Sequence, residues 1–125
     1  MRFAKVVFWC AGVWGIVVLA PLYFMLRTVN LHAPPAITHP EFYYGFVGVA
    51  LVWQFAFILI ATDPVRFKPM MIPSMFEKFG FFATMVVLHS QMRVIRGQVI
   101  VAIPDLILGL LFVAAYFKTS KTWNL

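Results

Sequence analysis

Four polar side chains within long apolar stretches of the 125-residue sequence are of types that could do chemistry. They are the carboxyls of Glu77 and Asp105, the imidazole of His89 and the amide of Gln54. A polar group in an apolar environment costs free energy unless it is partnered, so each is a natural candidate for function. A carboxyl facing a second carboxyl or an imidazole could move a proton on a bound molecule, and an amide could orient that molecule. Asp105, Glu77 and His89 are therefore the candidate catalytic residues.

Each of these residues also has a structural interpretation. Glu77 follows Ser74 at capping-box spacing, which would explain it as part of a helix start. Asp105 directly follows Pro104, where a helix loses a backbone hydrogen bond, so the acid could serve to join helices. Gln54 could link two helices by hydrogen bonding, and a lone histidine is more often a satisfied polar residue than a catalyst.

The composition indicates a membrane protein. Apolar residues make up 63% of the chain and charged residues only 11%, and the mean hydropathy is +0.93. A net charge of +6 would suggest nucleic acid in a soluble protein, but here the cations lie at the ends of apolar runs. The expected partner is thus the lipid bilayer and not nucleic acid. The single cysteine, Cys10, excludes an internal disulfide and dithiol redox chemistry.

Four apolar runs are long enough to cross a hydrocarbon layer of about 30 Å as helices. They cover residues 6–26, 42–62, 73–92 and 99–117. The connections after the second and third runs are short, which favours antiparallel neighbours. The sequence therefore predicts an all-α protein with a single transmembrane domain, an up-down four-helix bundle.

Two of the expected helices begin at capping-box spacings, Thr38 to Glu41 and Ser74 to Glu77. The segment from Arg27 to Glu41 is expected to be a polar connection, because it contains three prolines. The charges set the orientation, since seven cations fall on one side and three on the other. The first set is Arg2, Lys5, Arg66, Lys68, Lys78, Lys118 and Lys121. The second set is Arg27, Arg93 and Arg96. Both termini are thus expected in the cytoplasm, with Trp123 near the membrane surface.

Helical spacing aligns polar residues on three of the runs. The three stripes are Tyr43, Ala50 and Gln54; Glu77, Thr84 and Gln91; and Asp105, Gly109, Phe112 and Tyr116. Depth along the helices would allow Asp105 to hydrogen bond Gln54 or to pair with His89. Together with the aromatic rings of Trp53 and Tyr43, Gln54 and Asp105 are the candidate ligand-binding residues.

No metal or cofactor is expected. His32, His39 and Glu41 offer three possible ligands on one connection, but their spacing matches no common metal pattern. His89 is the single histidine within an apolar run, so two axial histidines for haem are not available there.

The segment Thr38–Gln54, followed by Asp63–Arg66 and Phe76–Lys78, resembles a group of short four-span bacterial membrane proteins of uncharacterised function. In length and four-span layout the chain is also similar to the DoxX-like proteins, a resemblance that implies redox-related or chaperone-like roles. Asp63-Pro64 followed by Glu77 looks like part of the sterol-isomerase type of four-span protein, with Asp105 as a second acid. That family and the small multidrug transporters carry an acid in the first span, which this chain lacks.

The sequence favours a non-enzymatic, multi-pass protein of the bacterial inner membrane. It would act by association, as an accessory subunit of a membrane complex, as a homo-oligomer, or as a binder of a hydrophobic small molecule. The alternative is an enzyme that acts on an isoprenoid or sterol-like lipid, with Asp105 as the proton donor or acceptor and Glu77 or His89 as its counterpart.

Overall fold

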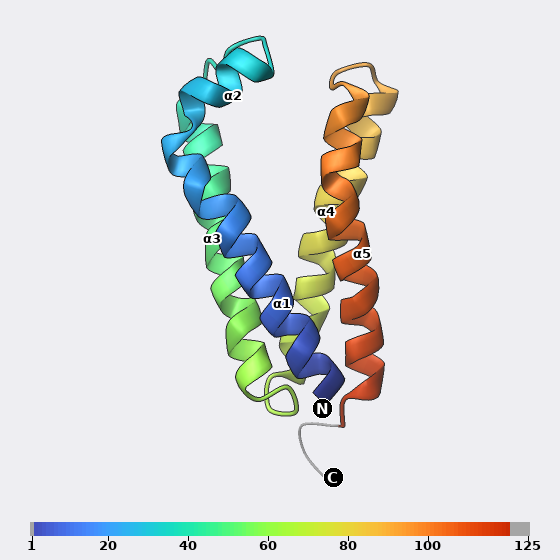
Figure 1. Cartoon of the computed structure of the whole chain (residues 1–125). Coiled ribbons are helices and arrows are strands. Elements are labelled where there is room, and N and C mark those ends of the chain that lie inside the picture. Colours follow the sequence, from blue (N-terminus) through green and yellow to red (C-terminus); the bar gives the residue numbers. More distant parts are fainter. Residues whose placement is uncertain (1, 121–125) are drawn as a thin grey trace.

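The structure, a computed structural model, describes residues 2–120, and within that range it contains helices and no strands (Figure 1). The helices are α1 (Arg2–Leu19), α2 (Leu26–His32), α3 (Pro40–Thr62), α4 (Met71–Ser90) and α5 (Arg96–Lys118). Two 3₁₀ turns, η1 (Ala20–Phe24) and η2 (Lys68–Met70), extend α1 and precede α4. The protein is an up-down bundle of four long apolar helices, as the sequence predicts.

The four long helices form two antiparallel hairpins, α1 with α3 and α4 with α5 (Figure 1). The hairpins meet at the end of the molecule that carries the N-terminus and the end of α5, and they diverge toward α2 and the α4–α5 turn (Figure 1). With η1 and η2 included, each long helix supplies a candidate membrane span of 23 residues, with mean hydropathies from 1.4 to 2.4. Length and composition thus suit all four to a bilayer.

The main hydrophobic core lies in the half where the hairpins meet. Phe8 of α1 stacks on Phe112 of α5 with ring centroids 4.2 Å apart, and Phe57 of α3 meets Phe112 edge-on at 5.0 Å. Buried alanines such as Ala4, Ala61 and Ala115 surround the three rings. Small residues let helix backbones approach closely, which is how helices associate in lipid.

Glycines set the contact between α1 and α3. A Cβ at Gly12 would lie 2.9 Å from the backbone oxygen of Gln54, and a Cβ at Gly15 would overlap the Gln54 side chain. On the other hairpin, Gly109 of α5 lies directly beneath the ring of Phe79 of α4. These contacts fix the register of both hairpins.

Both expected capping boxes are wrong. Helix α4 begins at Met71, so Ser74 lies inside it and its hydroxyl donates to the Met70 carbonyl at 2.7 Å. Helix α3 begins at Pro40 and has no side-chain cap; the Thr38 hydroxyl contacts His39 Nδ1 at 3.0 Å instead. Proline at the first helical position has no N–H that needs a cap, and a preceding 3₁₀ turn supplies carbonyls to the start of α4.

The first connection is more ordered than its prolines suggest. It contains the seven-residue helix α2, and Asn30 closes the following loop by accepting a hydrogen bond from the Ile37 N–H at 2.9 Å. The orienting cation Lys121 and the expected surface anchor Trp123 lie outside the described residues.

Candidate functional site

A cluster of three charged side chains lies in the middle of the α4–α5 hairpin. The Lys78 ammonium is 3.6 Å from Asp105 Oδ1 and 3.7 Å from Glu77 Oε2. Lys78 is the most deeply buried of the three, with 4% of its side chain exposed, against 18% for Glu77 and 22% for Asp105. We call these three residues the charged cluster.

The charged cluster adjoins the aromatic core of Phe8, Phe57 and Phe112. The Lys78 ammonium is 5.0 Å from the centroid of the Phe57 ring, so it also makes a cation–π contact across to the other hairpin. Lys78 shares one face of α4 with the other two buried residues of that helix, Met71 and Ser74, at spacings of three and four. No residue of α4 beyond Lys78 is buried, because the hairpins diverge there (Figure 1).

The charged cluster could bind a polar group or move a proton. Two acids and one lysine leave an excess of acid, and Glu77 Oε2 is buried without a hydrogen-bond partner. Neither ion-pair distance is short enough for a hydrogen bond, which has a usual limit of about 3.2 Å for N–H···O. Charged groups at this depth are expensive and usually face a bundle interior or a cavity.

The structure places Asp105 in one cluster with Glu77, but it does not bring Asp105 together with His89 or Gln54, the other two partners that the sequence suggested. His89 is exposed, with its Nδ1 3.1 Å from the Val94 carbonyl oxygen, near the end of α4. Because Phe79 lies over Gly109 in an antiparallel pair, His89 is level with about residue 99, which is about 9 Å along the axis from Asp105. The two side chains therefore occupy different levels of the hairpin.

Gln54 packs in the contact between α1 and α3. It is 1% exposed, its amide nitrogen donates to the Ala50 carbonyl at 2.7 Å, and its oxygen lies against Gly15. The oxygen has no hydrogen-bond partner. Gln54 thus fills the space that a side chain at position 15 would need, within the contact between α1 and α3.

The two aromatic ligand-binding candidates are also engaged within the α1–α3 hairpin. The Tyr43 hydroxyl donates to the Leu22 carbonyl at 2.6 Å and so ties α3 to η1. Trp53 packs against the core, with its ring centroid 6.2 Å from that of Phe57. Neither residue lies with Asp105.

Sequence reasoning missed Lys78, which it counted as a cation at the edge of the third span. The available signal was helical spacing, because Lys78 falls on the same stripe as Ser74 and Met71 and two turns into the helix. With η2 included, the span runs from Lys68 to Ser90, so Lys78 and Glu77 lie near its middle.

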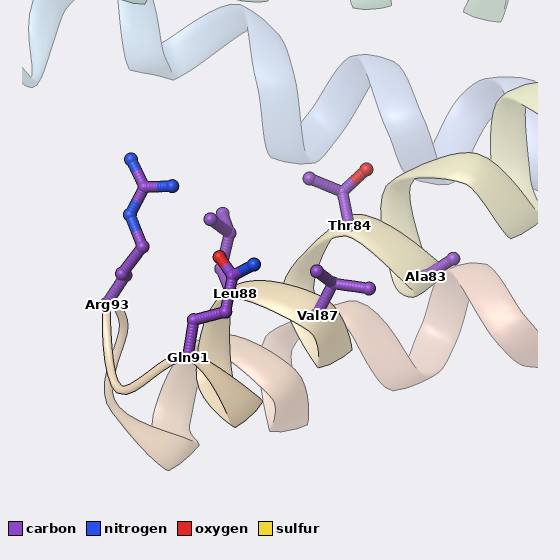
Figure 2. A pocket seen from close by; sticks show the side chains of 6 residues that line it. All are labelled: Ala83, Thr84, Val87, Leu88, Gln91 and Arg93. Carbon is purple, nitrogen blue, oxygen red and sulfur yellow. The ribbon is translucent and has the colours of Figure 1, made fainter.

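An open pocket of about 370 Å³ lies farther along α4. Its lining residues are Ala83, Thr84, Val87, Leu88, Gln91 and Arg93. Figure 2 shows these side chains projecting from the same side of α4 and of the turn that follows it. None of the residues that the sequence proposed as ligand contacts lines it, although Thr84 and Gln91 belong to the polar stripe that includes Glu77.

No metal-binding group is found within residues 2–120, where no three His, Cys, Asp or Glu side chains lie close enough to hold an ion. Comparison with protein-family models, with curated proteins and with solved structures found no match. The resemblances drawn from the sequence stay predictions.

Proposed function

We propose that the protein is a non-catalytic membrane protein that binds a hydrophobic molecule with a polar group in the open pocket along α4. The observation that carries the proposal is that Thr84 of α4 and Gln91, which follows the end of α4, are exposed and line the pocket in one polar stripe with the partly buried Glu77. At the deep end of the stripe, Glu77 Oε2 is buried without a hydrogen-bond partner, so a polar group of the bound molecule would give it one.

The dimensions of the site suit a small lipid-like molecule. The pocket volume of about 370 Å³ is within the usual range for ligand sites, and the pocket contains two members of the stripe. From Gln91 to Glu77 the stripe extends 14 residues, or about 21 Å, which matches an extended apolar chain. The molecule would lie along α4, with the charged cluster at its deep end.

We propose the bacterial inner membrane as the location, with both termini in the cytoplasm. The support is the charge distribution, since Arg2, Lys5, Arg66, Lys68 and Lys118 fall at the end where the hairpins meet, against three arginines at the other. Excess cations mark the cytoplasmic side of membrane proteins.

The test is to purify the protein in a mild detergent and to identify bound molecules by mass spectrometry. Val87→Trp would fill the pocket, while Val101→Trp makes the same change on α5 outside it; the two valines are 51% and 66% exposed. We expect the wild type and Val101→Trp to retain the same hydrophobic molecule and Val87→Trp to lose most of it. Equal retention by both variants would refute the proposal, and stable copurification of a membrane protein in place of a small molecule would favour an accessory subunit.

Acid–base chemistry on a bound lipid is the second candidate, favoured by the Lys78 ammonium, which lies 3.7 Å from Glu77 Oε2 and 3.6 Å from Asp105 Oδ1. Such groups can pass a proton between enzyme and substrate. This candidate requires that Asp105→Asn retain the bound molecule but leave it chemically unchanged on incubation, whereas the wild type converts it. Identical products from both proteins would exclude a role of Asp105 in proton transfer.

A further inference from the structure

Within the described residues 2–120, five cations lie at the end of the molecule where the hairpins meet (Figure 1). They are Arg2, Lys5, Arg66, Lys68 and Lys118, which we call the basic end. One acidic side chain, Asp63, is near them, and it accepts a hydrogen bond from the Arg66 backbone N–H at 3.3 Å. Among residues 2–120, Lys78 is the cation of both ion pairs. The cations of the basic end are therefore not neutralised by acids in that range.

Two of these cations each lie against an aromatic ring of a neighbouring element. The Lys68 ammonium of η2 lies 4.6 Å from the centroid of Tyr116 on α5, and the Lys118 ammonium of α5 lies 4.5 Å from the centroid of Phe3 on α1. A ring attracts an ammonium group through its face but does not neutralise the charge. Both ammonium groups can therefore still attract an anion.

Exposed apolar side chains adjoin the same cations. Phe117, between Tyr116 and Lys118 in the sequence, is 78% exposed, and Met70 and Val6 are 41% and 56% exposed. Because the candidate spans begin at Arg2 and Lys68 and end at Lys118, the basic end lies at the boundary between hydrocarbon and headgroups. The surface thus combines positive charge with apolar contact area.

The geometry points to the basic end as a binding site for an anionic phospholipid, with the phosphate beside Lys68 and Lys118 and the acyl chains against Phe117 and Met70. Lipid chains fit the apolar side chains, which a soluble anion would leave exposed. The bound headgroup joins η2, α5 and α1, so it stabilises the half of the bundle that holds the aromatic core. This site is independent of the proposed ligand site in the pocket along α4.

The experiment measures thermal unfolding of the full chain in neutral detergent micelles that contain increasing phosphatidylglycerol, or phosphatidylcholine with the same acyl chains. We expect phosphatidylglycerol to raise the Tm and phosphatidylcholine to have little effect. Each cation near an anionic lipid contributes to binding, so Lys68→Gln/Lys118→Gln should need about thirtyfold more phosphatidylglycerol for half the effect. Arg27→Gln/Arg96→Gln removes two cations from the opposite end and should behave as the wild type.

Three results would overturn the inference. The first is an equal rise in Tm with the two lipids. The second is that the two double variants lose the phosphatidylglycerol effect to the same extent. The third is that soluble glycerol phosphate raises the Tm as much as phosphatidylglycerol does. If the lysine double variant does not fold, each single variant is expected to need about fivefold more phosphatidylglycerol, and an unchanged requirement in both would also overturn it. Val87→Trp, which tests the pocket, should leave the phosphatidylglycerol effect intact.

Discussion

The ammonium of Lys78 on α4 and the carboxylate of Asp105 on α5 form an ion pair of 3.6 Å near the middle of the two helices. The pair joins the two helices of one hairpin, and the contact of Lys78 with Phe57 extends it to the other hairpin. A charge in an apolar interior is tolerated only with a partner. The pair therefore fixes the position of α4 at the level where the hairpins begin to diverge.

Lys78→Met should destabilise the protein more than Asp105→Asn. The methionine variant leaves two acids, Glu77 and Asp105, without their cation, whereas the asparagine variant leaves Lys78 still beside Glu77. Removing one partner of a buried pair costs on the order of 3 kcal/mol. The free energy of unfolding can be measured by titrating SDS into mixed micelles.

The exposed acid Asp63 provides the control for this experiment, because Asp63→Asn removes a carboxylate that has no ion pair among the described residues. We expect Asp63→Asn to change the free energy of unfolding by less than about 0.5 kcal/mol. If Lys78→Met were as mild as this control, the ion pair would have no part in stability.

Gly15→Ala should separate α1 from α3. The added methyl group would overlap the Gln54 side chain, and overpacking of this kind costs about 1–3 kcal/mol. Gly80→Ala is the matched control, because a Cβ at Gly80 has no neighbour within 4 Å, and the helix itself favours alanine by about 0.5–1 kcal/mol. The free energy of unfolding of both variants can be measured by the same SDS titration.

Shortening Gln54 tests whether overlap with its side chain is what makes Gly15→Ala destabilising. In Gly15→Ala/Gln54→Ala the space taken by the amide is free. The double variant should therefore lose less free energy of unfolding than the two single variants lose together. Strict additivity would mean that the two positions do not compete for the same space.

Much of the fold could be predicted because hydropathy alone identifies a helix that crosses lipid, and short connections determine which helices are antiparallel. The polar stripe of Glu77, Thr84 and Gln91 could likewise be predicted from helical spacing. The position of Lys78 could not, because a lysine near the start of a span usually marks its edge, and α4 is the least apolar of the four spans.

The partner of Asp105 depends on features that lie outside any single helix. Whether Asp105 meets Lys78, Gln54 or His89 depends on the register of α4 against α5, which is set by the ring of Phe79 over Gly109. It depends also on the packing of Gln54 against Gly15, which places the amide in the contact between α1 and α3. Neither the register of two helices nor the packing between them can be predicted from the spacing of residues along one segment.

Phe112→Ala should weaken the half of the bundle where the hairpins meet. The ring of Phe112 is fully buried and contacts both Phe8 and Phe57, so its removal leaves a cavity and costs about 3 kcal/mol or more. Phe117→Ala, on the same helix but 78% exposed, should have little effect on the free energy of unfolding. Equal losses in the two variants would place the main packing of α5 elsewhere.

Arg66 and Arg93 should be accessible from opposite faces of the membrane. Arg66 lies in the connection between α3 and α4 and Arg93 in the turn between α4 and α5, and the whole length of α4 separates them (Figure 1). In a Cys10→Ser background, single variants Arg66→Cys and Arg93→Cys can be treated with a membrane-impermeant maleimide in intact cells and in inverted vesicles. Excess cations at the basic end predict labelling of Arg66→Cys in inverted vesicles and of Arg93→Cys in intact cells. Labelling of both from one face would contradict a crossing by α4, and the reverse pattern would contradict cytoplasmic termini.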